Sequence, residues 1–244
     1  MSDLIYDVER MLDELGMTTA AINWKKLMDD PEFGNYSSRQ VLCEILTPQY
    51  EEMLNRRYET NLKFSKLIDR SAKTENLRTG SGRKYNDETV QQVLSFRFVS
   101  TGQNVGVYGK TGAGKSYFLS ALCNEACRLN YRCQIHDYCD MIDELIRLNH
   151  ESLEKYTKRL RYYSRLRILF IDDFCISRYS EEGVNILYHL LKSRDDLHYP
   201  TVFNSQYAPS DWGAQLGSDP NCYGKVDGIR RRLTNGYTIE IVKL

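Results

Sequence analysis

Residues 109–116 read GKTGAGKS, and this segment constrains the chain more than any other. It matches the pattern G-x-x-x-x-G-K-S, in which glycines let main-chain N–H groups curl around phosphate oxygens without a side chain in the way. Apolar residues 105–108 precede it, and a helical pattern over residues 117–129 follows it. The motif requires a strand, a loop and a helix in this order, so we predict a phosphate-binding loop.

The loop predicts a nucleoside triphosphate and Mg²⁺ as ligands. Lys115 places a positive charge near the β- and γ-phosphates, and the Ser116 hydroxyl is a ligand for Mg²⁺. The helix beginning near Lys115 points the positive end of its dipole at the anion. The residues predicted to contact the nucleotide are Gly109, Lys110, Thr111, Gly112, Ala113, Gly114, Lys115, Ser116 and Tyr117.

Two acids follow a continuously apolar segment, Ile168–Ile171, which is typical of a buried parallel strand. We predict that Asp172 holds Mg²⁺, directly or through water, and that Asp173 orients or deprotonates an attacking water. A strand that merely ends in solvated carboxylates is the alternative. Residues 200–206 form another strand candidate with a polar end, where an amide could sense the γ-phosphate; an ordinary strand-end turn is the alternative there.

Three consecutive arginines, Arg230 to Arg232, precede the last apolar run of the chain. A guanidinium in this position could reach a neighbouring subunit's nucleotide and offset charge in the transition state. A solvated or DNA-facing charge cluster fits the same residues, and their spacing does not choose between the two.

Short apolar runs alternate with helical patterns from residue 104 to residue 242, which predicts an α/β domain with a mostly parallel sheet. The first 75 residues carry helical patterns instead. Gly16 is expected to end the first helix, and Pro48 to mark a break or a first turn in a later one. The segment Thr79–Arg83, TGSGR, is the best linker candidate, so we expect a domain boundary near residues 75–85.

Composition excludes several classes of protein. Hydrophobic residues make up 41% of the chain, which permits a buried core, and the 33 basic and 33 acidic residues exclude a uniformly basic DNA-packaging protein. No apolar run approaches the roughly 20 residues of a membrane span, and the first residues do not resemble a secretory signal. The seven cysteines include no CxxC pair, so we expect reduced thiols in a cytoplasmic protein. Cys123 and Cys127 share a helix face, where core packing is favoured over zinc.

Local charge predicts contact with DNA. Residues 56–84 hold nine basic and three acidic residues, and residues 155–167 hold six basic residues, no acid and three interleaved tyrosines. This composition suits a phosphate backbone with occasional stacking, and no base-reading motif is present, so we expect duplex binding with little sequence preference. A solvated helix face is the alternative. The predicted contacts are Lys155, Lys158, Arg159, Arg161 and Arg165.

The chain resembles a known family across nearly its whole length. The segments GVYGKTGAGKSYFLSALCNEACRLNYRC, ILFIDDF, VFNSQYAPSDW and GIRRRLTNGYTIEI resemble the nucleotide-binding, acidic, sensor and closing segments of the IstB/DnaC-like AAA+ ATPases. That group comprises helper ATPases of insertion-sequence transposons and loaders of the replicative helicase. The pair Ser205-Gln206 followed by Trp212, and the N-terminal segment with Leu15-Gly16-Met17, are most similar to the IstB branch.

The resemblance implies a P-loop NTPase of the AAA+ class, with a RecA-like parallel sheet and flanking helices. It implies an N-terminal helical domain over residues 1–75, a basic linker and lead-in helix over 76–100, and an ATPase domain over 101–244 without a C-terminal lid. It assigns ATP and Mg²⁺ as cofactors, Asp173 as the catalytic acid, and Gln206 as sensor 1, with Asn204 or Ser205 as substitutes. It assigns Arg232 as the trans-acting finger, although Arg231 stands where the family usually has Asp.

The function implied by the resemblance is a DNA-stimulated ATPase that forms a homo-oligomer on DNA and delivers target DNA to a transposase. A loader of the replicative helicase would use the same site and is the first alternative. A P-loop kinase or GTPase is more distant, since no Asn in the chain is followed by the Lys of the guanine-binding N-K-x-D motif. A non-catalytic adaptor that only binds nucleotide does not need the Asp172-Asp173 pair.

Overall fold

The structure is a computed structural model that describes residues 2–80, 82–216 and 222–244. Ser81, part of the predicted linker, lies outside the described residues. The chain divides into two compact units, Met1–Thr60 and Asn61–Leu244. The division falls earlier in the chain than the boundary expected near residues 75–85. The reason is that the segment beginning at Asn61 already forms hydrogen bonds within the larger unit. The Ile135 amide donates to the carbonyl of Ser65 at 2.8 Å, and the Asn124 side chain donates to the carbonyl of Ala72 at 3.0 Å.

The N-terminal unit is helical, as the sequence predicts. It contains helices α1 (Ser2–Glu14) and α2 (Thr18–Met28), a short 3₁₀ helix (Phe33–Asn35), and most of α3 (Ser38–Phe64). Gly16 ends α1 in the left-handed conformation, with φ +73°. The amides of Gly16 and Met17 donate to the carbonyls of Asp13 and Leu12, which is the paired bonding of a Schellman cap.

The expected break at Pro48 is wrong, because α3 runs through this residue without interruption. A proline inside a helix removes one main-chain hydrogen bond and crowds the preceding turn. Contacts from α2 hold the turn that follows: the side chain of Gln49 accepts from the Ala20 amide at 3.2 Å, and Glu52 accepts from the Thr19 hydroxyl. Packing between the helices therefore outweighs the local preference.

The larger unit is built on a five-stranded parallel sheet, which confirms the predicted fold class. The strand order is β3-β4-β5-β2-β6. The first four residues of β4 are apolar and fully buried, as expected for a strand covered on both faces. The strands are β2 (Asn104–Tyr108), β3 (Cys133–Asp137), β4 (Ile168–Asp172), β5 (Thr201–Ser205) and β6 (Gly236–Glu240).

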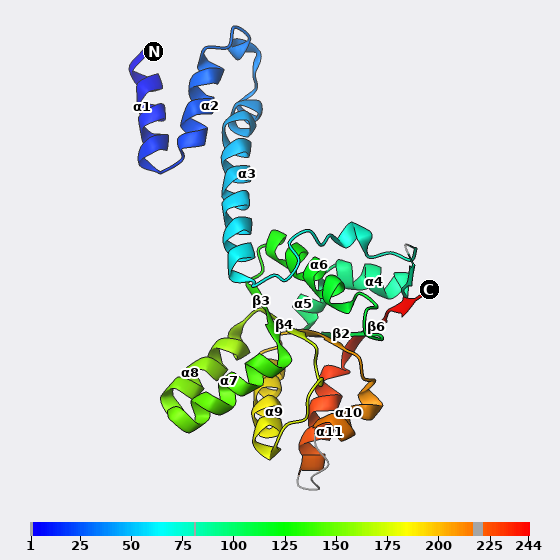
Figure 1. Cartoon of the computed structure of the whole chain (residues 1–244). Coiled ribbons are helices and arrows are strands. Elements are labelled where there is room, and N and C mark those ends of the chain that lie inside the picture. The colour runs from blue at the N-terminus through cyan, green and yellow to red at the C-terminus, as the bar shows by residue number, and fades with distance from the viewer. Residues whose placement is uncertain (1, 81, 217–221) are drawn as a thin grey trace. The chain divides into compact units, whose positions relative to one another are not determined.

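Helices cover both faces of this sheet (Figure 1). Helices α4 and α6 lie on one face, and α7, α9 and α11 on the other (Figure 1), with α8 packed against α7 and α9. The helices of this unit are α4 (Asp87–Leu94), α5 (Arg97–Thr101), α6 (Lys115–Arg128), α7 (Tyr138–Glu151), α8 (Leu153–Arg165), α9 (Glu181–Asp196), α10 (Trp212–Leu216) and α11 (Tyr223–Leu233), with 3₁₀ turns at Thr74–Asn76 and Pro209–Asp211. Among the described residues, no helix is long and apolar enough to cross a membrane.

The C-terminal end of the predicted linker is paired with a distant segment of the chain. Gly80 and Arg83 exchange main-chain hydrogen bonds of 2.9 and 3.0 Å across a tight turn. The next strand, β1 (Arg83–Lys84), pairs antiparallel with β7 (Val242–Lys243) in a separate two-stranded ribbon. Small residues gave the segment a flexible composition, but its partner strand lies about 160 residues away in sequence and left no local signal.

Arg194 on α9 holds the starts of two sheet strands in place. Its guanidinium is 1% exposed and donates to the Thr201 hydroxyl at 3.0 Å and to the carbonyls of Leu166 and Tyr163 at 2.9 and 2.8 Å. Burial lowers the pKa of Arg194 to about 9. The carboxyl ends of β2, β4 and β5, whose residues lie in register, then meet at the opposite edge of the sheet.

Candidate nucleotide-binding site

The loop between β2 and α6 has the backbone expected of a phosphate cradle. Gly114 precedes the first turn of α6 and adopts a left-handed conformation, with φ +100°. A side chain on Gly109 would approach the carbonyl oxygen of Ile241 to 2.6 Å, so the close packing of this turn also requires glycine. The sequence therefore folds locally into a loop that ends at the positive end of α6.

Arg83 lies against this loop, and the sequence gave no reason to include it in the site. Its Nε atom donates to the carbonyl of Ala113 at 2.9 Å. A Cβ atom on Gly114 would come within 2.7 Å of the same nitrogen. The pairing of β1 with β7 holds Arg83 there, and only the resulting long-range contact identifies it.

Lys115 and Ser116 lie at the start of α6. The Lys115 side chain is 7% exposed, and its ammonium group donates to the carbonyl of Lys110 at 3.3 Å. Burial lowers the pKa of Lys115, while the nearby Asp173 and Asp172 carboxylates act in the opposite direction. The Ser116 hydroxyl donates to the Asp172 carboxylate at 3.1 Å. These contacts join the loop to the end of β4.

Asn204 connects the two acids. Its amide nitrogen donates to the Asp172 carboxylate, and its amide oxygen accepts from the main-chain N–H of Asp173 at 2.8 Å. Asn204 is fully buried on β5, beside β4, so its side chain is committed to these contacts. The Phe174 amide also donates to the carbonyl of Asn204 at 2.9 Å. Asn204 thus fixes where both acids point.

Asp173 adopts a left-handed backbone conformation with φ +53°, which is uncommon outside glycine and occurs often at functional sites. Burial raises the pKa of its carboxyl group above the ordinary value, and the neighbouring Asp172 adds to this effect. Lys115 lowers the pKa of the same carboxyl group. Two carboxylates and one ammonium group therefore share a small, partly buried volume.

A cavity of about 390 Å³ opens between the loop and Asp173. Gln206, just beyond β5, lines the cavity, and its amide oxygen accepts from the Thr111 hydroxyl at 3.0 Å. The amide nitrogen of Gln206 keeps two hydrogen atoms to donate. The residues around the cavity are Thr111, Gly112, Gly114, Lys115, Ser116, Tyr117, Asp173, Ile176 and Gln206. Of these, Ile176 was not predicted.

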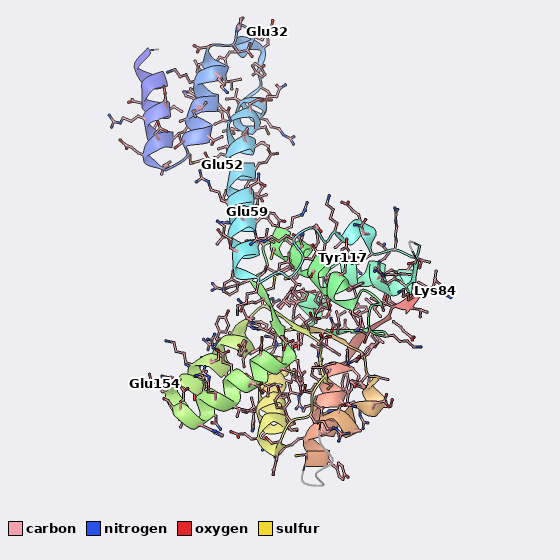
Figure 2. All side chains as sticks on the ribbon, in the orientation of Figure 1. Glu32, Glu52, Glu59, Lys84, Tyr117 and Glu154 are labelled. Carbon is pink, nitrogen blue, oxygen red and sulfur yellow. The ribbon has the colours of Figure 1, made fainter. Side chains whose placement is uncertain are left out.

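Three predicted nucleotide-binding residues, Gly109, Lys110 and Ala113, do not line the cavity. Ala113 is 1% exposed, and its carbonyl group faces Arg83. Tyr117, labelled in Figure 2, lines the cavity and also accepts from the Asn76 side chain at 2.8 Å. The segment before β1 therefore reaches the same end of α6.

The oxygen donors present fit Mg²⁺. The Ser116 hydroxyl and the Asp172 carboxylate are adjacent, and oxygen is the donor that this cation prefers. Both groups lie at the loop where phosphates would bind. The predicted magnesium ligands are therefore brought together by the fold.

The three arginines near the end of α11 differ in their surroundings. The Arg232 side chain is 11% exposed, lies 3.3 Å from the Asp195 carboxylate, and stacks over the ring of Tyr188. Arg230 is paired with Asp227. Arg231 is exposed, and no ion pair is found for it within the described part of the chain. The predicted finger, Arg232, is therefore packed inside its own subunit.

The predicted DNA contacts on α8 also divide into two groups. Arg159 lies 2.7 Å from the Glu144 carboxylate and over the ring of Tyr162, and Lys155 lies 3.7 Å from Glu151. Lys158, Arg161 and Arg165 are exposed and share one helix face, and they have no ion pair among the residues described. Glu154 on the same helix is labelled in Figure 2.

Two of the three tyrosines of α8, Tyr162 and Tyr163, make contacts within the domain. Tyr163 is 2% exposed, and its hydroxyl donates to Glu144. The Tyr162 hydroxyl donates to the side chain of Gln134 at 2.6 Å. The sequence expectation of stacking aromatics is wrong for these two residues, because their rings help to attach α8 to the domain.

A family model and a curated relative both match this chain over most of its length. Residues 10–228 match the family described as IstB-like ATP binding protein. A putative insertion sequence ATP-binding protein, y4uH of Sinorhizobium fredii, is 24% identical over 232 residues, covering 95% of this chain and 90% of that protein.

Solved structures agree on the fold. The crystal structure of DnaI superposes with a TM-score of 0.60 at 22% identity, covering 73% of this chain and 96% of that chain. AMPPCP-bound DnaA from Aquifex aeolicus gives 0.57 at 20% identity, covering 71% of this chain and 51% of that one. The match thus spans about half of the DnaA chain, and it shows that the two chains share a fold.

Proposed function

This chain belongs to the family of IstB-like ATP-binding proteins, and from that premise we propose that it hydrolyses ATP while assembled on DNA and delivers target DNA to a transposase. The observation that carries the proposal is the chain of contacts from Ser116 through Asp172 to Asn204 and Asp173 beside the phosphate loop. A protein that only grips a nucleotide does not need two acids held in this way. The insertion-sequence relative supports the transposase as partner.

In the proposed mechanism, main-chain N–H groups of residues 110–116 and the Lys115 ammonium group bind the phosphates. Ser116 and Asp172 would hold Mg²⁺, which when bound neutralises charge on the β- and γ-oxygens. Asp173 accepts a proton from the attacking water, and its raised pKa brings it closer to the working pH. The Gln206 amide donates toward the γ-phosphate position, since its oxygen is already occupied by Thr111.

The decisive experiment measures ATP binding and hydrolysis with and without duplex DNA. We expect DNA to stimulate hydrolysis. Lys115→Ala should weaken ATP binding by about 100-fold or more, because a buried charge pair is worth several kcal/mol. Lys192→Ala, on α9 and away from the loop, is the matched control. ATP binding that survives Lys115→Ala, or hydrolysis indifferent to DNA, would contradict the proposal.

A loader of the replicative helicase is the second candidate, because the replicative helicase loader DnaI of Bacillus subtilis is 27% identical over 120 residues, covering 48% of this chain and 37% of that protein. A co-purification assay with the transposase and with the replicative helicase distinguishes the two functions. We expect ATP-dependent retention of the transposase. Retention of the helicase alone would favour the loader.

A further inference from the structure

Three cysteine sulfur atoms meet in the core of the larger unit, away from the nucleotide site. Cys123 and Cys127 lie on α6, and Cys133 begins β3. The Cys133 sulfur lies 3.7 Å from each of the other two, and all three sulfurs lie within 4.8 Å of one another. The sequence brought only Cys123 and Cys127 together, on one helix face. The sheet supplies the third sulfur.

The spacing of these atoms suits a metal ion. The sulfurs form a triangle with two sides of 3.7 Å and a third of at most 4.8 Å. A point equidistant from all three lies about 2.1 to 2.4 Å from each, and metal–thiolate bonds to zinc measure about 2.3 Å. The sulfur separations already present therefore match those of a bound ion. A disulfide, in contrast, would need a sulfur separation of about 2.05 Å.

The surroundings favour an ion that needs only three ligands. Among the described residues, no histidine or carboxylate joins the group. The Ser65 side chain neighbours Cys123 and Cys127 and is fully buried, and its hydroxyl donates to the Leu62 carbonyl at 2.8 Å. Thiolates bind zinc, iron–sulfur clusters and Cu(I), but zinc usually takes four ligands, so three sulfurs with no fourth ligand favour Cu(I).

We propose that Cys123, Cys127 and Cys133 form a three-thiolate site for Cu(I). Binding forms three copper–sulfur bonds and releases the thiol protons to solvent, and no electron is transferred. The bound ion would join α6 to β3, the edge strand of the sheet, eight or more residues along the helix from Lys115. At 1.5 Å per residue this is about 12 Å or more from the phosphate loop, so the site is separate from ATP binding.

Simple packing is the competing explanation. The three side chains are at most 1% exposed, free cysteine packs as a small hydrophobe, and the Cys133 thiol lies 3.9 Å from the Cys123 carbonyl as a weak donor. Packing alone predicts no affinity for copper. It also predicts that a serine or alanine at these positions changes stability without changing metal content.

The test titrates the full chain with Cu(I), without oxygen and against a competing chelator of known affinity. We expect one ion per chain, a higher melting temperature with copper, and three sulfur neighbours by X-ray absorption. Cys133→Ser should weaken copper binding by more than about 100-fold, since even the groups that only orient a ligand contribute 10- to 100-fold. Cys43→Ser, at an exposed position on α3, is the matched control.

Cys123→Ala provides a second variant in case Cys133→Ser folds poorly. Copper affinity unchanged in either folded variant, or lost equally in Cys43→Ser, would overturn the site. Tighter binding of Zn(II) than of Cu(I) would overturn the choice of metal. ATP binding by Cys123→Ala should match the wild-type chain, so failure of the copper site leaves the proposed ATPase function untouched.

Discussion

The Nε atom of Arg83 donates a hydrogen bond to the main-chain carbonyl of Ala113 at 2.9 Å, on the phosphate loop. In a loop of this kind the N–H groups must converge on the ligand, so its carbonyl groups need partners elsewhere. Arg83 supplies one such partner. We therefore interpret Arg83 as a residue that positions the loop rather than one that takes part in the reaction.

The first prediction follows from this contact. Arg83→Ala should raise KM for ATP about 10-fold, equivalent to about 1.4 kcal/mol, and change kcat much less. Arg83→Lys should restore part of the affinity because it keeps one donor. Leu244→Pro, which removes the N–H that bonds to the Gly82 carbonyl, should act in the same direction by loosening the ribbon. Steady-state kinetics on these variants tests the effect.

Lys84→Ala is the control for that series, since Lys84 is the exposed neighbour of Arg83 in β1. Its KM should stay at the wild-type value. A rise in KM as large as that of Arg83→Ala would show that any damage to the ribbon matters and that the guanidinium does not.

The second prediction concerns acid and base. Burial and Asp172 raise the pKa of Asp173, so its carboxyl group stays protonated to a higher pH than an ordinary aspartate. Hydrolysis should therefore fall on acidification at a pH above about 3.9, the ordinary value. Asp173→Asn should keep ATP binding and lose about 10²- to 10⁴-fold in kcat. A pH–rate profile of the wild-type chain and the kcat of Asp173→Asn test the two expectations. Normal turnover in Asp173→Asn would rule out the assigned role.

The same shift predicts a change in stability. A carboxyl group with a raised pKa in the folded state stabilises the fold below its unfolded pKa, and this contribution is lost as the pH rises through the folded pKa. At pH 7 the ionised Asp173 therefore disfavours folding, and Asp173→Asn should melt at a higher temperature. The difference should shrink as the pH is lowered. A lower melting temperature at pH 7 would be inconsistent with this account.

The third prediction separates the arginines of α11. Arg232→Ala should lower the melting temperature, because it removes a packed ion pair with Asp195. Arg231→Ala should leave the melting temperature unchanged and lower hydrolysis by about 10³-fold or more, the usual effect of removing an arginine finger. Mixing inactive Arg231→Ala and Lys115→Ala chains should restore activity if the guanidinium acts across subunits. No recovery on mixing argues against this role for Arg231.

The fourth prediction concerns DNA. Reversing Lys158, Arg161 and Arg165 to Glu should weaken duplex binding at all sequences and reduce the salt slope by about 3. Reversing Lys25, Lys26 and Arg39 of the N-terminal unit changes the charge equally and serves as control. Arg159 is left intact in both, because its pairing with Glu144 supports the fold. Anisotropy titrations at several salt concentrations measure the affinity for duplex DNA and its salt slope. Equal salt slopes for the α8 variant and the control variant would exclude α8 from the interface.

The sequence predicted the parts of the site that depend on neighbours in the chain. The phosphate loop, the acids after β4 and the polar end of β5 each carry a local signal, and parallel strands bring them to one edge. What the sequence missed depends on distant pairing. Arg83 is placed by β7, and Arg194 is held by carbonyl groups of two separate segments, residues 163–166 and Pro200.

The charge pattern of the sequence also did not show which of several neighbouring arginines are exposed and which are paired. Arg159 and Arg161 are two positions apart on α8, yet one is paired with Glu144 and the other is exposed. Arg231 and Arg232 differ in the same way. A helix turns neighbouring side chains toward different faces, so the partner on the adjacent helix decides which cation is available.

The ribbon of β1 and β7 couples the phosphate loop to a segment that lies outside the main sheet. Arg83 lies in this ribbon, and its guanidinium donates to the Ala113 carbonyl of the phosphate loop. A movement of the ribbon reaches Ala113 through the Arg83 guanidinium. A shift of this ribbon would thereby loosen or tighten the hold on ATP with no change at the acids themselves.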